Sequence, residues 1–200
     1  SFGTVDLAGV KMLDPGLDHL GYMARSFDDL AVYYDIVRGA IPSVLADGIG
    51  RAPRVGLCRT FKWDLAEPET VKAIEDAAAA LAGMGAEIIE QNLPADMADI
   101  AETHMMILHV GLSQNLAPEW NDHRDQISDR LQGMIQAGFD TSEEDYDAAM
   151  ARAADYRARA DDLFGDCDIF LTPSAPGIAP RGLDATGDPM FQIPWTLLRT

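Results

Sequence analysis

Few side chains in this sequence could act as a nucleophile, and Ser174 is the most tempting of them. A serine hydrolase of the α/β-hydrolase type presents its nucleophile in a Gly-x-Ser-x-Gly turn between a strand and a helix. Ser174 instead lies in the segment Pro173-Ser174-Ala175-Pro176, which lacks those glycines. We therefore expect a structural serine here, and no catalytic residue.

Two histidines and two cysteines are the candidate metal ligands. His104 and His109 are five positions apart, whereas a zinc-binding pair on a helix is four apart and shares one face. Cys58 and Cys167 each lie in a short apolar segment, which predicts buried reduced thiols rather than a disulfide or a metal cluster. Arg59 beside Cys58 leaves a second interpretation, a thiol with a lowered pKa. We expect no metal and no cofactor.

Three carboxylates, Asp122, Asp125 and Asp129, recur at helical spacing. Neighbouring carboxylates can serve as general acid and base. A solvated acidic face of one helix explains the same spacing without any chemistry, and it is the favoured interpretation.

Composition limits the class of partner. The chain has 200 residues, of which 48% are hydrophobic, enough for a sizeable core or part of a larger one. It carries 33 acidic and 15 basic residues and a formal net charge of -18, so nucleic acid and anionic membranes would be repelled. No apolar run approaches the roughly 20 residues that cross a bilayer, and no signal peptide is evident. We expect a soluble cytoplasmic protein that binds neither nucleic acid nor membrane.

The order of predicted strands and helices indicates an α/β fold. Residues 55–58 read as a buried strand, Pro68 begins a helix, and residues 86–90 read as a second strand. Such short connections favour a right-handed crossover between parallel strands. Residues 167–171 form a third strand, which ends at a segment with two prolines, residues 172–176. The prediction is a mixed β-sheet flanked by helices.

One helix and one tight turn are predicted near the start of the chain. Ser26 is a predicted N-cap for a helix that Gly39 ends, between loops at residues 1–25 and 41–52. Asp14-Pro15-Gly16 predicts a tight turn in the first loop.

Residues 96–164 predict three helices, separated near Pro118 and between Gly138 and Ser142. Thr141 and Glu144 have the spacing of a capping box. The last twenty or so residues read as loop.

One segment resembles a known family. The sequence contains Leu17-Asp18-His19-Leu20-Gly21-Tyr22-Met23-Ala24-Arg25-Ser26 followed by Asp28-Asp29-Leu30. This run resembles the segment Ser-Leu-Asp-x-x-Gly-Pro-Met-Ala-Arg-Ser-Val-x-Asp-Leu of the amidase-signature family. Ser1-Phe2-Gly3 resembles the end of its Lys-Pro-Ser-x-Gly element, and Asp168-Ile169-Phe170-Leu171-Thr172-Pro173-Ser174 resembles its late strand and Thr-Pro turn. Tyr22 stands where the family has proline, and Gly16 where serine is common.

The resemblance implies an amidase-signature fold and an amide hydrolase. Such an enzyme cleaves a small-molecule carboxylic amide by acyl transfer through a serine, without metal or organic cofactor. In the family, the catalytic lysine and the two catalytic serines lie before the point that matches Ser1. Residues 1–200 would then be a later portion of the domain that shapes the fold and the substrate pocket, with the upstream catalytic portion and the extreme C-terminus absent. A homodimer is compatible with the sequence.

Two groups of residues could contribute to a substrate site. Asp18 and Arg25 would either anchor the turn and the following helix, which is favoured, or line the mouth of an active site. The predicted helices 97–117 and 119–137 carry apolar residues for which core packing is favoured over an acyl-side pocket. These are Met97, Met105, Met106, Leu108, Leu112, Leu116, Trp120, Ile127, Leu131, Met134 and Ile135.

Two other functions remain open. The same resemblance fits the amidase-like subunit of a tRNA-dependent amidotransferase, which releases ammonia from glutamine for use by a partner subunit. Without the serines and lysine, the chain could instead be a non-catalytic binding or scaffold module derived from an amidase.

Overall fold

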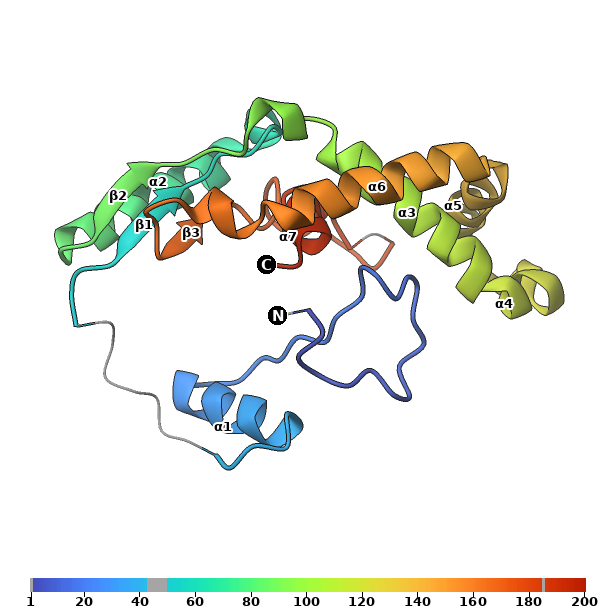
Figure 1. Ribbon diagram of the computed structural model, residues 1–200, viewed down its shortest axis with the longest axis horizontal. Helices are drawn as coiled ribbons and strands as arrows, with labels where there is room; N and C mark the ends of the chain where they lie inside the picture. The colour runs from blue at the N-terminus through green and yellow to red at the C-terminus, as the bar shows by residue number, and fades with distance from the viewer. Residues whose placement is uncertain (1, 43–49, 185) are drawn as a thin grey trace. The chain divides into compact units, whose positions relative to one another are not determined.

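The computed structural model describes residues 2–42, 50–184 and 186–200 (Figure 1). The chain divides into two compact units. Unit 1 comprises Ser1–Gly48, Met105–Ala148 and Arg199–Thr200, and unit 2 comprises Ile49–His104 and Ala149–Leu198.

Unit 2 contains a three-stranded parallel sheet. Its central strand, β1 (Arg54–Leu57), pairs with β2 (Glu87–Glu90) on one side and with β3 (Ile169–Leu171) on the other (Figure 1). Helix α2 (Pro68–Gly83) connects β1 to β2 and has its proline in the first turn, where a missing N–H is harmless. The predicted α/β class is confirmed. The predicted mixed sheet is not found, because both strand pairings among the described residues are parallel.

A close contact between β1 and β3 explains the glycine in the central strand. A methyl group at Gly56 would lie 2.6 Å from a ring carbon of Phe170. That ring stacks on Phe164 with centroids 4.5 Å apart and lies 5.5 Å from the ring of Trp195. Trp195 belongs to α7 (Ile193–Leu198), so the prediction that the last residues are all loop was wrong.

The segment predicted to hold three helices contains four α-helices in its described residues. They are α3 (Ile100–Asn115), α4 (Ala117–Asp122), α5 (Asp129–Asp140) and α6 (Glu143–Ala158). Short 3-10 turns occur at Trp63–Leu65, Ala95–Met97, Arg124–Gln126 and Asp161–Phe164. Pro118 lies in the first turn of α4, so it begins a helix rather than breaking one. Among the residues described, no helix is long and apolar enough to span a membrane.

The cap of α6 lies one residue later than predicted. The Ser142 hydroxyl accepts a hydrogen bond from the Asp145 N–H at 3.1 Å and donates one to the Asp145 carboxylate at 2.6 Å. Thr141 instead donates its hydroxyl to the carbonyl of Ala137 at 2.8 Å, within the preceding helix. Two adjacent hydroxyl residues thus divide the roles of ending one helix and capping the next.

The apolar residues of α3, α4 and α5 form the core of unit 1. Leu112, Leu116 and Ile135 are buried at its centre. Partly buried side chains pack around them, namely Leu108, Trp120, Ile127, Leu131 and Met134. Core packing is therefore confirmed for these residues. At Gly138 a methyl group would lie 2.0 Å from the carbonyl oxygen of His109, so α5 can approach α3 only through glycine.

Helix α1 (Phe27–Val37) has the predicted ends. The Ser26 hydroxyl accepts a hydrogen bond from the Asp29 N–H at 3.1 Å. Gly39 has a φ of +71° and donates its N–H to the carbonyl of Ile36 at 2.9 Å, a left-handed conformation that glycine adopts without strain. Residues 2–25 contain turns and extended backbone, as expected. Most of the predicted loop at 41–52, residues 43–49, lies outside the described residues.

Candidate functional site

Two adjoining hollows in unit 1 form the candidate site, which we call the tyrosine recess. One has a volume of about 250 Å³ and the other of about 310 Å³. Both are lined by Gly21, Tyr22 and Leu30. The first is completed by Thr4, Val5, Leu20 and Tyr34, and the second by Met23, Ala24, Asp29 and Tyr33. The recess thus combines the segment that resembles the amidase signature with the face of α1 that follows it.

Tyrosine rings supply much of its wall. The rings of Tyr22 and Tyr33 are 4.9 Å apart at their centroids and inclined by 56°, within the range of favourable aromatic pairs. Hydrogen bonds from the side chains of Thr4 and then Arg38 lower the pKa of Tyr34. The Arg38 guanidinium carbon lies 4.6 Å from the centroid of the Tyr34 ring. These contacts hold the Tyr34 ring against residues 2–5.

A turn before the recess is fixed by two aspartates. Asp18 accepts hydrogen bonds from the N–H groups of Leu13 at 2.6 Å and of Asp14 at 3.3 Å. The buried Asp14 carboxylate accepts one from the N–H of Gly16 at 2.7 Å. The predicted turn and the predicted anchoring role of Asp18 are confirmed. Arg25 is exposed and makes no hydrogen bond or ion pair with the residues that the structure describes, so its predicted anchoring role is not observed.

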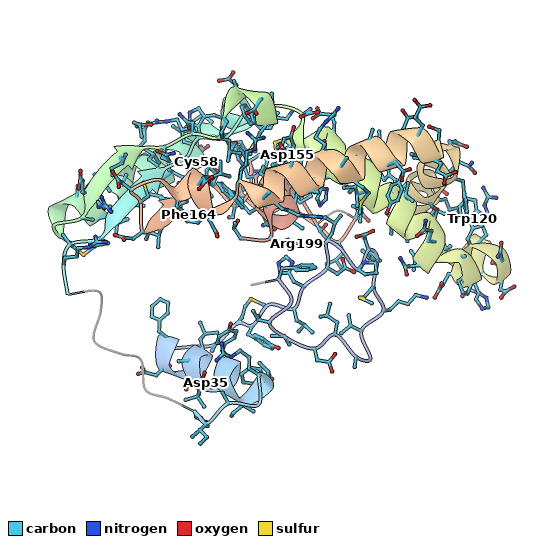
Figure 2. The ribbon with its side chains drawn as sticks, viewed as in Figure 1. Asp35, Cys58, Trp120, Asp155, Phe164 and Arg199 are labelled. Carbon is cyan, nitrogen blue, oxygen red and sulfur yellow. The ribbon has the colours of Figure 1, made fainter. Side chains whose placement is uncertain are left out.

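Arg199, which Figure 2 labels, contacts both Gly16 and Phe2 in unit 1. Its Nε and Nη2 donate to the carbonyl oxygen of Gly16 at 3.2 and 3.1 Å. Its guanidinium carbon also lies 4.0 Å from the centroid of the Phe2 ring. Phe2 lies two residues before Thr4 of the recess, and Gly16 lies four residues before Leu20. Sequence reasoning missed Arg199, because no local pattern links it to a glycine 183 positions away.

The described lining of the recess lacks the paired nucleophile and base that acyl transfer through a serine uses. The described lining contains no lysine, arginine or histidine, and Asp29 is its one carboxylate. Its hydroxyl groups, on Thr4 and three tyrosines, have no histidine or lysine beside them within that lining to act as a base. The recess therefore offers aromatic and apolar surface with little charge.

Ser174 lies outside the recess, and no neighbouring group hydrogen-bonds to its hydroxyl in the described part of the chain. It is exposed, and its carbonyl accepts a hydrogen bond from the Gln192 side chain at 3.1 Å. Nothing in this geometry activates it as a nucleophile.

The histidines and cysteines behave as packing residues. His104 is buried and His109 half-buried on α3, and burial lowers the pKa of His109. Cys58 and Cys167 are buried free thiols, and desolvation raises the pKa of both. The inert interpretation of Cys58 is confirmed over a lowered pKa. Among the described residues, no three His, Cys, Asp or Glu side chains are grouped to hold a metal ion.

The three spaced aspartates do not share a helix. Asp122 ends α4, Asp125 lies in the 3-10 turn Arg124–Gln126, and Asp129 begins α5. All three are exposed, as expected of solvated carboxylates. The predicted common helical face was wrong, because the chain changes direction at His123 and again at Ile127.

Comparison with known proteins covers nearly the whole chain. The Amidase family model matches residues 1–193. The chain is 28% identical over 193 residues to 2-amino-5-chloromuconic acid deaminase of Comamonas testosteroni, covering 91% of this chain and 40% of that protein. It is 25% identical over 228 residues to a glutamyl-tRNA(Gln) amidotransferase subunit of Koribacter versatilis, covering 95% and 47%.

The fold agrees with a solved structure as well. A crystal structure of an amidase superposes with a TM-score of 0.84 at 22% identity, covering 99% of this chain and 47% of that one. The chain thus spans less than half the length of each of these three proteins. Since the family model extends over residues 1–193, this chain belongs to the Amidase family.

Proposed function

We propose that residues 1–200 are the later portion of an amide hydrolase whose nucleophile and base lie on polypeptide upstream of them. The observation that carries this proposal is the family match over residues 1–193 together with coverage of only 40–47% of the relatives. The parent enzyme would convert a small-molecule carboxylic amide to an acid and ammonia or an amine, through a serine ester and without metal or organic cofactor.

The role of this portion would be to bind and orient the substrate. The tyrosine recess has no activated nucleophile but has a shaped apolar wall. Contacts to the non-reacting part of a substrate can be used to position its amide and so raise the rate of the chemical step. Mutation of the recess should therefore affect turnover of the parent enzyme although no recess residue touches the reacting bond.

The test begins with the native protein purified from its source cells. Its intact mass and N-terminal sequence are measured, and ammonia release is assayed with aliphatic and aromatic amides, with and without a sulfonyl fluoride and with EDTA. We expect a mass about twice that of this chain, inhibition by the sulfonyl fluoride and no effect of EDTA. Residues 1–200 alone are the control and should release no ammonia.

Two outcomes would contradict the proposal. One is turnover, sensitive to the sulfonyl fluoride, by residues 1–200 alone. The other is a native protein of only these 200 residues, which would favour a non-catalytic binding or scaffold module instead.

We place the protein in the cytoplasm, because both described cysteines are buried free thiols, as is usual in a reducing compartment.

A second candidate function is that of an amidotransferase component. Relatives named as subunits of glutamyl-tRNA(Gln) amidotransferase match the chain, for example at 25% identity over 95% of its length. In that case the native protein would hydrolyse glutamine and would copurify with partner proteins. Assay with glutamine and a pull-down of the native protein distinguish the two, because a free amide hydrolase needs neither.

A further inference from the structure

Helix α1 is apolar on two sides. On one side Leu30 and Tyr34 are half-buried and line the recess. On the other side lie Val32, Tyr33 and Ile36, which we call the outer stripe. Their spacing of i, i+1 and i+4 places them on one face of a helix, and they are 41%, 54% and 56% exposed. A helix that is apolar on both sides is typical of a helix enclosed within a larger protein.

The charge of the chain argues against a second copy as the partner of the outer stripe. Helix α1 contains three aspartates and no basic residue, and the chain carries a net charge of -18. Of the two arginines that flank the helix, Arg38 lies over the Tyr34 ring, and Arg25 is exposed. Two copies that met through the same helix would bring like charges together. An anionic membrane surface is disfavoured for the same reason.

The length of the solved relative indicates what covers the outer stripe. The amidase of known structure shares the fold of this chain, yet this chain covers 47% of it. More than half of that polypeptide therefore lies outside the matched part. Two parts of one folded polypeptide are held together mainly by burial of apolar surface. The outer stripe offers such surface within the described residues.

We propose that the outer stripe of α1 is a contact surface for the part of the same polypeptide that precedes residue 1 in the parent enzyme. This inference rests on the function proposed above, which places the nucleophile and the base on that part. Tyr33 belongs both to the outer stripe and to the lining of the recess, so the covering segment lies beside the recess. The contact thereby holds the part that carries the chemistry next to the part that binds the substrate.

Maleimide labelling of the native full-length protein tests whether the stripe is covered. Ile36→Cys places a thiol on the outer stripe, and mass spectrometry follows the labelling of its own peptide. We expect this thiol to react at least tenfold more slowly in the native protein than in urea. Met84→Cys, at the end of α2 where Met84 is 77% exposed, is the control and should differ less than threefold. A rate at position 36 within threefold of that in urea overturns the inference.

Photo-crosslinking identifies the segment that covers the stripe. A photoreactive benzoylphenylalanine is incorporated at position 36 of the full-length protein, which is then illuminated and digested. We expect cross-links to peptides that precede residue 1 in the same molecule. Cross-links only to residues 49–198 or only to a second molecule overturn the inference.

The controls separate covering from folding and from catalysis. Urea midpoints of the full-length variants identify any that fails to fold, and Val32→Cys on the same stripe then carries the comparison. A native protein with no polypeptide before residue 1 defeats both proposals. A native protein that releases ammonia but labels rapidly at position 36 defeats only this one, so the two failures are distinguishable.

Discussion

Unit 2 and the N-terminal segment of unit 1 use their apolar and polar groups differently. In unit 2 the central strand is buried from Val55 to Leu57, and Asp168 is paired with Arg51. In unit 1 the one residue of α1 that is buried is a carboxylate, Asp35, whereas Phe27 is 81% exposed and Ile36 is 56% exposed. Burial of apolar surface stabilises a fold, and exposed apolar surface is available for binding. We infer that unit 2 supplies framework, whereas residues 2–42 leave several apolar side chains of α1 exposed.

Polar contacts support the same contrast. In unit 2 the Tyr156 hydroxyl and the Arg152 guanidinium both donate to Asp99, and burial together with Asp99 raises the pKa of Tyr156 to about 12. Arg159 forms ion pairs with Asp96 and Asp155, at 2.8 Å each. In unit 1 the hydrogen bonds of Asp18 and Arg199 instead reach backbone groups of Leu13 and Gly16. Those bonds shape loops rather than join helices.

The largest effect should come from Gly138→Ala in the helical core of unit 1. The added methyl group would lie 2.0 Å from a backbone oxygen of His109, which cannot move without displacing α3. We expect a loss of about 3 kcal/mol in the free energy of unfolding, measured by urea titration. Gly133→Ala on the same helix meets no atom within 4 Å and should stabilise by about 0.5–1 kcal/mol. Equal stability of the two variants would contradict the packing described.

A smaller loss should follow Gly56→Ala in unit 2. The methyl group would meet the ring of Phe170 at 2.6 Å, and this ring is hindered from turning by Phe164 and Trp195. We expect a loss of about 2 kcal/mol, with hydrogen exchange accelerating in β1 more than in α1. Gly83→Ala, with nothing within 4 Å, is the control. If exchange accelerated mainly in α1, the framework role of unit 2 would be wrong.

Asp18→Ala should cost about 1 kcal/mol, because the N–H groups of Leu13 and Asp14 lose their acceptor. Asp6→Ala removes only one such bond, from the N–H of Ala8 at 3.0 Å, and should cost less. Urea titration of the two variants measures the difference. Equal stability of the two variants would contradict the anchoring role of Asp18.

The smallest effect concerns acid stability of unit 2. Hydrogen bonds from Arg51 and from the Arg54 N–H lower the pKa of Asp168 to about 2, below the roughly 3.9 of an unfolded aspartate. The stabilisation is thus complete above about pH 4 and is lost as the pH falls toward 2. Asp168→Asn should flatten the fall of the urea midpoint over this interval. Arg51→Gln should flatten it less, because the backbone bond remains, and an unchanged slope in both would refute the assignment.

Local signals explain which elements the sequence predicted correctly. Ser26 and Gly39 mark the ends of α1, because a hydroxyl cap and a left-handed glycine act within one turn. The order of β1, α2 and β2 was predicted correctly, because short connections join two strands through a helix. The cap of α6 was misplaced, because Thr141 and Ser142 are equally suited to it and the end of α5 decided between them. Helix α7 was missed, because six residues containing a proline have too little period to recognise.

By itself the sequence determined the α/β class, the resemblance to the amidase signature and the anchoring role of Asp18, all of which depend on residues near one another in the chain. The tertiary structure alone decided that Tyr22, Tyr33 and Tyr34 line one recess, and that Arg199 joins Phe2 to Gly16. The physical reason is that such contacts depend on how distant segments pack. Neither secondary-structure propensity nor hydrophobic periodicity predicts that packing.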